Sequence, residues 1–207
     1  MKTLLGYIQN LRIYSFVDFI LLMFVLGARE FDMLGAISLW LFFLLYLEWK
    51  HKHSYRSPVS IWSCVVCLAL GLFLFPNIGA IGFVLFGLLY AEKQRTFWSL
   101  LSPFFRGMQM TILAAPFISI TALPILLVGL LSFIRNLLGD VRDTGKDKKE
   151  QMYTIPVALG LKKNIPYIHL LAVMGTTYVW WMYSNISILF LIALWLIQIG
   201  TYRLTPR

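Results

Sequence analysis

The sequence predicts an all-α protein, a single polytopic transmembrane helix bundle of about eight helices that occupies residues 1–207 as one domain. Composition predicts this first: 59% of the 207 residues are hydrophobic, and the mean hydropathy is +0.77. Charge predicts it second, because only 13% of residues are Asp, Glu, Lys or Arg, about half the share of a soluble domain. The third observation is that short charged segments separate a series of long apolar runs.

The apolar runs define the helices in order. A membrane span needs about 20 apolar residues, or fewer where flanking side chains reach the interface. The predicted spans are residues 12–28, 33–49, 58–76, 77–92, 103–117, 119–141, 165–182 and 184–202. Phe75-Pro76-Asn77 predicts a tight turn between the third and fourth spans, and Ser184-Asn185 separates the last two. Pro116 leaves a re-entrant pair open for the fifth and sixth.

Basic residues mark one side of the predicted bundle. With eight spans, the loops on one side hold nearly all of them, and the opposite loops hold only Arg29. The positive-inside rule then places both termini in the cytoplasm and makes the chain a multi-pass integral membrane protein. The net charge is +9. Because the basic residues cluster between apolar runs, we expect the lipid bilayer as their partner and no nucleic acid.

Four polar or sulfur-bearing residues inside the apolar runs are considered individually. Cys64 and Cys67 predict small buried helix residues and no disulfide framework. Asp18, in the first span, indicates either a functional carboxylate or a structural ion pair, with Arg135 as a candidate partner. Gln109 indicates either a functional group or a hydrogen bond between helices.

Three of the nine acidic residues fall in one short window, as Asp140, Asp143 and Asp147. Spacings of three and four place them on one helical face, where mutual repulsion calls for cations. Oxygen ligands suit Mg²⁺, which also binds substrate phosphates. Spacing alone leaves a metal site and a solvated, salt-bridged loop equally open. Asn136 precedes Asp140 by one turn, so we expect the end of this helix to line a wet, charged cavity.

The segment from Asp140 to Gly160 resembles the second aspartate-rich motif of the UbiA superfamily of intramembrane prenyltransferases. The resemblance is ungapped and lies after the sixth span, as in that family. The residues that carry it are Asp140, Arg142, Asp143, Asp147, Thr154, Pro156, Leu159 and Gly160. Tyr90-Ala-Glu-Lys-Gln-Arg95, Arg56 with Pro58, and the lead-in Tyr7-Ile-Gln-Asn-Leu-Arg12 are more weakly similar to other family segments.

The resemblance implies a Mg²⁺-dependent transferase that moves a prenyl group from a prenyl diphosphate to an aromatic or other lipophilic acceptor. Metal ions and basic side chains would stabilise the departing diphosphate. By this resemblance, the metal candidates are Asp140, Asp143, Asp147 and Glu48. The diphosphate-binding candidates are Arg56, Lys93, Arg95, Arg142 and Asn136, of which Lys93 and Arg95 are also the catalytic candidates.

The chain departs from the family pattern at three places. The family's first aspartate motif is replaced by Trp40 to Glu48, in which only Glu48 is acidic, and the neighbouring His51 and His53 are expected to be solvated. Gln151-Met152-Tyr153 stands where the family has a glycine followed by a basic residue. A ninth span is missing. These departures leave open a catalytically degenerate relative that binds prenyl lipids or partners.

Two other classes of membrane protein agree less well with the sequence. A phosphatidyltransferase that uses a CDP-alcohol also has clustered aspartates, but Thr144 stands where its pattern requires glycine and no second acidic run follows. A small-solute transporter would have repeats and a polar site at the midplane. Here the polar residues gather at one membrane face.

Overall fold

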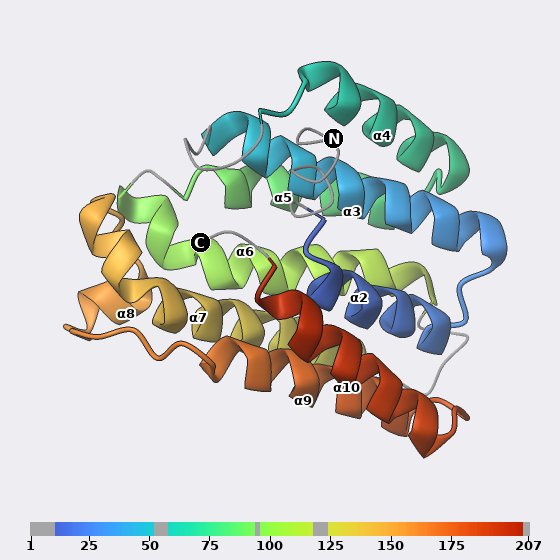
Figure 1. Ribbon diagram of the computed structural model, residues 1–207. Helices are drawn as coiled ribbons and strands as arrows, with labels where there is room; N and C mark the ends of the chain where they lie inside the picture. The colour runs from blue at the N-terminus through green and yellow to red at the C-terminus, as the bar shows by residue number, and fades with distance from the viewer. Residues whose placement is uncertain (1–10, 52–57, 94–95, 118–123, 205–207) are drawn as a thin grey trace.

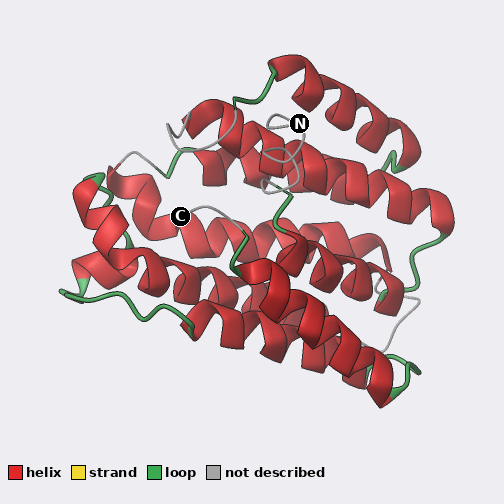
Figure 2. Ribbon diagram, viewed as in Figure 1, coloured by secondary structure: helices red, strands yellow, loops and turns green. Residues whose placement is uncertain are grey.

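The computed structural model describes residues 11–51, 58–93, 96–117 and 124–204, and within these ranges all regular structure is helical, with no strand (Figure 2). The all-α prediction is therefore confirmed. The elements are α2 (Ile13–Val25), α3 (Glu30–His51), α4 (Ile61–Leu74), α5 (Ile78–Ala91), α6 (Thr96–Ala114), the 3-10 turn η1 (Ala115–Phe117), α7 (Ile125–Lys149), α8 (Ile155–Ala158), α9 (Ile168–Met182) and α10 (Ile188–Tyr202).

Each predicted span corresponds to one long helix, but the boundaries differ. Helices α2, α4, α5, α9 and α10 have 13 to 15 residues and are shorter than their predicted segments. Helix α7 is longer: it continues past residue 141 to Lys149, so the aspartate motif is helical throughout. Lys146, Lys148 and Lys149 lie in its last turn, where cations interact favourably with the helix dipole.

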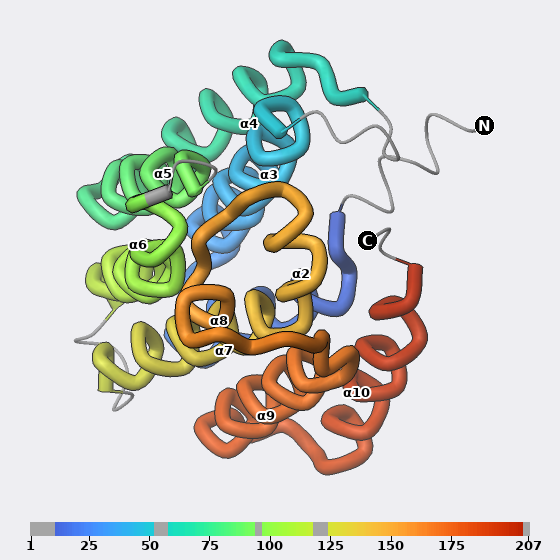
Figure 3. The backbone as a smooth tube through the Cα atoms, turned by 90° about the vertical axis from the view of Figure 1, so that its left-hand side faces the viewer, coloured from blue at the N-terminus to red at the C-terminus, as the bar shows by residue number. Residues whose placement is uncertain are grey.

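Six helices surround a central space. Successive contacts link α2 to α3, α3 to α5, α5 to α6, α6 to α7 and α7 to α9, and α9 packs against α2. Helix α4 packs on the outside of α3, and α10 packs against α2 and α9 (Figure 1). Viewed along the helices, the segment that contains α8 lies across one end of the bundle (Figure 3). This arrangement brings side chains from distant parts of the sequence to the same end of the central space.

The short connection between α4 and α5 is stabilised by a side-chain cap at the start of α5. Helix α4 ends at Leu74 and α5 begins at Ile78, which confirms the tight turn predicted there. The side-chain oxygen of Asn77 accepts a hydrogen bond from the backbone N–H of Ala80 at 3.0 Å, so one of the unpaired donors of the first turn is satisfied. Cys64 and Cys67 are free thiols, in agreement with the expectation of no disulfide framework.

Two separate sets of buried polar contacts tie helices together, one among α2, α7 and α9 and one between α5 and α6. The Asp18 carboxylate of α2 pairs with the Arg135 guanidinium of α7, so the predicted structural ion pair is present. Thr176 and Thr177 of α9 donate to the same carboxylate at 3.1 and 2.8 Å. Gln109 of α6 donates to the carbonyl oxygen of Phe83 on α5 at 3.0 Å, so of the two alternatives left open for Gln109 the bond between helices is present.

The outer surface carries many large apolar side chains. Phe73 is 80% exposed, Leu126 77% and Leu189 73%, and these residues come from three different helices. Among the described helices, α3 is the one that meets the length and hydropathy of a membrane-crossing segment, while five others are apolar but shorter.

Candidate functional site

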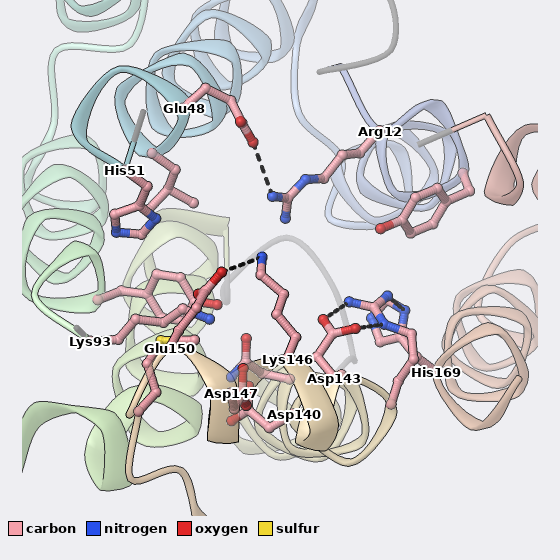
Figure 4. Close-up of a pocket in the computed structure, with 17 residues that line it drawn as sticks. Arg12, Glu48, His51, Lys93, Asp140, Asp143, Lys146, Asp147, Glu150 and His169 are labelled. Atoms are coloured by element: carbon pink, nitrogen blue, oxygen red, sulfur yellow. Dashed lines mark hydrogen bonds and ion pairs between the residues drawn. The ribbon is translucent and has the colours of Figure 1, made fainter. Parts of the chain in front are cut away.

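A polar cavity lies at the end of the bundle that α8 covers. Its volume is about 120 Å³. Figure 4 shows side chains from the end of α3, from the segment before α2, and from α7 and α9 converging on it. The charged and histidine side chains that line it are Arg12, Glu48, His51, Lys93, Asp140, Arg142, Asp143, Lys146, Asp147, Glu150 and His169. The predicted charged cavity at the end of this helix is therefore present.

The three aspartates of α7 all line this cavity, although each has a different environment. Asp140 is 4% exposed, and its carboxylate accepts a hydrogen bond from the Ser102 hydroxyl at 3.3 Å. Asp147 is 2% exposed and accepts from the Thr154 hydroxyl at 3.0 Å. Asp143 is less buried and is held by Arg142. The alternative of a solvated, salt-bridged loop does not describe this segment, because it is helical and two of its carboxylates are buried.

Arg142 contacts Asp143 on its own helix and also side chains of α9 and α10. Its Nε donates to Asp143 Oδ1 at 2.7 Å, and a second guanidinium nitrogen pairs with Oδ2, which gives a two-pronged ion pair. Its Nη1 lies 3.0 Å from Nδ1 of His169 and 3.4 Å from the Tyr202 hydroxyl. Burial acts to raise the pKa of Asp143, but the Arg142 guanidinium outweighs it and the pKa is lowered.

Lys93 faces the aspartates from the end of α5. Burial alone would lower the pKa of its ammonium group, but the nearby phenol of Tyr90, which ionises in the same alkaline range, and the carboxylates of Asp140, Asp147 and Asp143 raise it above the ordinary value. Lys93 therefore stays charged at neutral pH. The pKa of Asp147 is raised, because burial outweighs the opposing effects of Lys93 and of the Thr154 hydrogen bond.

Arg12 and Glu48 form the wall opposite the aspartates (Figure 4). Arg12 Nη2 lies 3.3 Å from Glu48 Oε1, and the Glu48 side chain is only 3% exposed. Arg12 has the left-handed backbone conformation, with φ 48°, which costs a residue other than glycine about 1 kcal/mol or more. Its Nε is buried and has no hydrogen-bond acceptor within the described residues. The guanidinium is thus held at the cavity with bonding capacity left over.

Several residues of the aspartate-rich motif lie in the segment after α7, where local structure accounts for their identity. Thr154 begins α8 and bonds Asp147, while Pro156 lies in the first turn of α8, where its missing N–H costs nothing. Gly160 has φ 77°, a conformation that favours glycine. Gln151, the second residue after α7, also has positive φ, at 56°.

A second cavity of about 80 Å³ adjoins the first, deeper between the helices. Arg12, Tyr14, Leu47, Tyr90, Asn136 and His169 line both cavities. The second cavity has more apolar lining, which includes Phe19, Leu22, Trp40, Phe43, Leu44 and Trp180. A polar chamber therefore leads directly into a more apolar one.

Most of the residues singled out from the sequence meet at the polar cavity. Asp140, Asp143, Asp147, Glu48, Lys93, Arg142 and Asn136 all line it. Arg56, Arg95 and His53 lie outside the described residues. His51, expected to be solvated, is instead half-buried at the cavity, with a ring nitrogen 3.2 Å from the carbonyl oxygen of Ala91.

Sequence reasoning did not assign Arg12 or His169 to the site. The available signal for Arg12 was its place as the last residue of the lead-in Tyr7-Ile-Gln-Asn-Leu-Arg12. His169 has no comparable signal, because only the packing of α9 against α7 brings it to the cavity.

The α7 face presents carboxylate oxygens, the kind of ligand that Mg²⁺ prefers. In the described ranges, no group of three or more His, Cys, Asp or Glu side chains is arranged as a cage that could hold a metal ion. Mg²⁺ does not require such a cage, because proteins commonly bind it through one or two carboxylates together with substrate phosphates and waters. Carboxylates of the α7 face would hold the ion, and Glu48 is held by Arg12.

Comparison with known proteins gave no match to a protein family, to a curated protein or to a solved structure.

Proposed function

We propose that this chain is a multi-pass integral membrane protein with both termini in the cytoplasm. The exposed apolar surface supports this proposal, because its contact with water is unfavourable whereas lipid acyl chains would solvate it. The helices of 13 to 15 residues rise about 20 Å, less than the hydrocarbon core, and flanking basic side chains can make up the difference. The polar cavity then opens at the basic, cytoplasmic end. Retention in the pellet after alkaline carbonate extraction tests this; release into the supernatant would contradict it.

We further propose that the chain is a UbiA-like, Mg²⁺-dependent prenyltransferase. The observation that carries the proposal is the polar cavity itself: three aspartates face Lys93, Arg12 and Arg142 in one chamber, which adjoins a second cavity with a larger share of apolar lining. A prenyl diphosphate has a polyanionic head, which suits the charged chamber, and an apolar chain, which the aromatic and aliphatic side chains of the second cavity can contact. The aspartates suit the metal ion that accompanies a diphosphate, and the basic side chains suit its oxygens.

The residues of the chamber would act on the leaving group. Mg²⁺, when bound, supplies charge neutralisation to the diphosphate oxygens. Lys93 and Arg12 stabilise the negative charge that develops as the allylic C–O bond breaks and its electron pair leaves with the diphosphate. Arg142 orients Asp143 and offers further donors. The allylic carbon then forms a bond to a nucleophilic atom of the lipophilic acceptor, which loses a proton.

A specific observation favours a second candidate, a degenerate relative that binds prenyl lipids without turnover. Glu48, the one acid left of the family's first motif, is paired with Arg12. One wall of the chamber therefore presents a guanidinium where the family pattern implies a second metal. Binding of the diphosphate is compatible with both candidates, whereas cleavage distinguishes them.

The deciding experiment uses purified full-length protein in detergent with a labelled prenyl diphosphate, in Mg²⁺ and in EDTA. The transferase predicts release of labelled diphosphate that requires Mg²⁺ and an added acceptor extract. Binding without release supports the degenerate relative. Neither binding nor release would overturn both. Arg29→Gln is a matched control, since it removes an exposed guanidinium that is remote in sequence from every chamber residue.

A further inference from the structure

An apolar groove runs along a different face of α7 from the three aspartates. Its volume is about 620 Å³, within the roughly 300–1,000 Å³ that is usual for sites that bind small molecules. Leu137, Leu138 and Val141 of α7 form one wall. Helix α8 and the segment after it form the other wall, and none of the described residues of the groove lines the polar chamber or the deeper cavity. The groove is therefore a separate feature of the molecule.

The walls of this apolar groove are exposed at the surface. Leu159 is 82% exposed and Ile165 is 45% exposed, and both line the groove together with Ile155 and Pro156 of α8. Large apolar side chains that are exposed together beside charged ones are typical of a surface that binds a ligand, a partner or a membrane. Within the described ranges no side chain fills the groove, so its walls are available to an apolar ligand.

Two adjacent lysines accompany the apolar groove and lack a countercharge. Lys162 lines the groove, Lys163 follows it in the chain, and both are exposed. Among the described residues neither lysine forms a salt bridge. The reason lies in the sequence, because no Asp or Glu follows Glu150. The groove thus combines apolar walls with positive charge that this part of the chain does not neutralise.

We propose that the apolar groove binds an anionic phospholipid of the cytoplasmic leaflet, with an acyl chain along its walls and the phosphate at Lys162 and Lys163. The inference rests on the proposed membrane location, in which the bilayer surrounds the outer apolar surface. A lysine can lay its alkyl stem along an apolar wall and hold its ammonium group at the lipid head groups. Clustered lysines attract anionic head groups, whereas a zwitterionic lipid brings a cation of its own. The groove therefore selects lipids by charge.

A lipid in this position would act on the cover of the polar chamber. An acyl chain in the groove contacts Val141 of α7 and both Ile155 and Pro156 of α8 at the same time. Thr154, the residue before α8, bonds Asp147 inside the chamber, and the segment that contains α8 lies across this end of the bundle (Figure 3). The bound lipid therefore holds α8 against α7 and favours the covered chamber.

Binding can be tested with two lipids that share their acyl chains and differ in charge. Native mass spectrometry of the purified full-length protein in detergent would titrate anionic dioleoylphosphatidylglycerol and zwitterionic dioleoylphosphatidylcholine. The titration needs no Mg²⁺ and no prenyl diphosphate, and carbonate extraction measures the membrane location independently, so failure of either proposed property is distinguishable from failure of this site. We expect the first phosphatidylglycerol to bind roughly tenfold more tightly than phosphatidylcholine, because two lysines attract it. Equal affinities for the two lipids would overturn the proposal.

The lysines are tested by two charge-matched double replacements. Lys162→Gln with Lys163→Gln should abolish the preference for phosphatidylglycerol. Lys148→Gln with Lys149→Gln removes the same charge from exposed lysines in the last turn of α7, which do not line the groove, and should leave the preference unchanged. Loss of the preference in both double variants would assign it to general surface charge and would refute the site.

The groove itself is tested at Ile165. Ile165→Glu places a negative charge beside the lipid phosphate and should weaken phosphatidylglycerol binding, whereas the isosteric Ile165→Gln should keep the preference. Equal phosphatidylglycerol binding by these two variants would show that the phosphate lies elsewhere and would refute the site. The head group alone, sn-glycero-3-phosphoglycerol, should bind far more weakly than the whole lipid. Equal affinity would show that the apolar walls contribute nothing, and this too would refute the site.

Hydrogen exchange tests the effect on the cover. Phosphatidylglycerol should slow the exchange of backbone amides in residues 155–161 of the native protein, and it should not do so in the variant that lacks both Lys162 and Lys163. Unchanged exchange in the native protein with the lipid bound would overturn the effect on α8.

Discussion

The hydroxyl of Thr154 donates a hydrogen bond to Oδ2 of Asp147 at 3.0 Å, and this bond fastens the start of α8 to the last carboxylate of the aspartate face. Both residues are buried. The segment that covers the polar cavity is thereby tied to the helix that supplies its acidic side chains.

Replacement of Thr154 by valine tests this bond. The side chain keeps its shape and loses its donor, so the buried carboxylate loses a charge-assisted hydrogen bond worth about 1.5–3 kcal/mol. We expect a lower free energy of unfolding by that amount and weaker Mg²⁺ binding, measured by denaturant unfolding and by titration. Thr201→Val is the control, since its hydroxyl donates only to the Ile197 carbonyl oxygen of its own helix. Equal effects of the two replacements would contradict the role of Thr154.

The raised pKa of Asp147 predicts how its replacement depends on pH. A carboxyl whose pKa is raised by folding destabilises the folded state at pH values above that pKa, where it is charged. Without Mg²⁺ at neutral pH, Asp147→Asn should therefore raise the melting temperature. The difference should shrink as pH falls through the raised pKa, because the native aspartate becomes protonated in both states. A difference that grows on acidification would contradict this reasoning.

With Mg²⁺ present, the effect of Asp147→Asn on the melting temperature should change sign. The carboxylate then contributes to holding the ion, so Mg²⁺ should raise the melting temperature of the native protein and not that of Asp147→Asn. Thermal unfolding in Mg²⁺ and in EDTA measures both effects in one series. A Mg²⁺ effect that survives the replacement would place the ion elsewhere.

The buried Asp18–Arg135 pair predicts strong coupling between two helices. Removal of one partner leaves an unpaired buried charge, so Asp18→Asn and Arg135→Gln should each cost about 3–5 kcal/mol of stability. The double replacement should cost much less than the sum, because neither charge is left unpaired. A double-mutant cycle from denaturant unfolding measures the coupling. Additive effects would show that the pair contributes no interaction of its own.

Gly160 offers a test of backbone conformation alone. A Cβ atom there would meet no atom within 4 Å, so the cost of Gly160→Ala comes from its φ of 77°. We expect a loss of about 1 kcal/mol. Gly175→Ala also has open space but lies inside helix α9, where alanine is favoured, and it should be neutral or stabilising. Similar losses at both positions would contradict the conformational account.

Much of the helical arrangement followed from local patterns. Apolar runs located every long helix, and Asn77 and Ser184-Asn185 marked turns that the structure contains. The ends of the helices were less predictable. Helix α7 continues through Asp143 and Asp147 because neighbouring cations and the covering segment make burial of these carboxylates tolerable, and a hydrophobicity pattern does not register such contacts.

The candidate site was likewise predictable from the sequence only in part. The spacing of Asp140, Asp143 and Asp147 placed them on one face, which the structure confirms. The pairing of Arg12 with Glu48 and the approach of His169 to Arg142 depend on packing between elements far apart in the sequence. No pattern within a single segment carries that information.

The most direct test of the central claim is the Mg²⁺-dependent binding of a labelled prenyl diphosphate to the purified protein. We predict saturable binding in Mg²⁺ that is lost in EDTA and reduced at least tenfold by Asp140→Asn or Lys93→Gln, while Arg29→Gln binds normally. Binding that is unaffected by EDTA and by these replacements, or no binding at all, would contradict the assignment of the polar cavity as a prenyl diphosphate site.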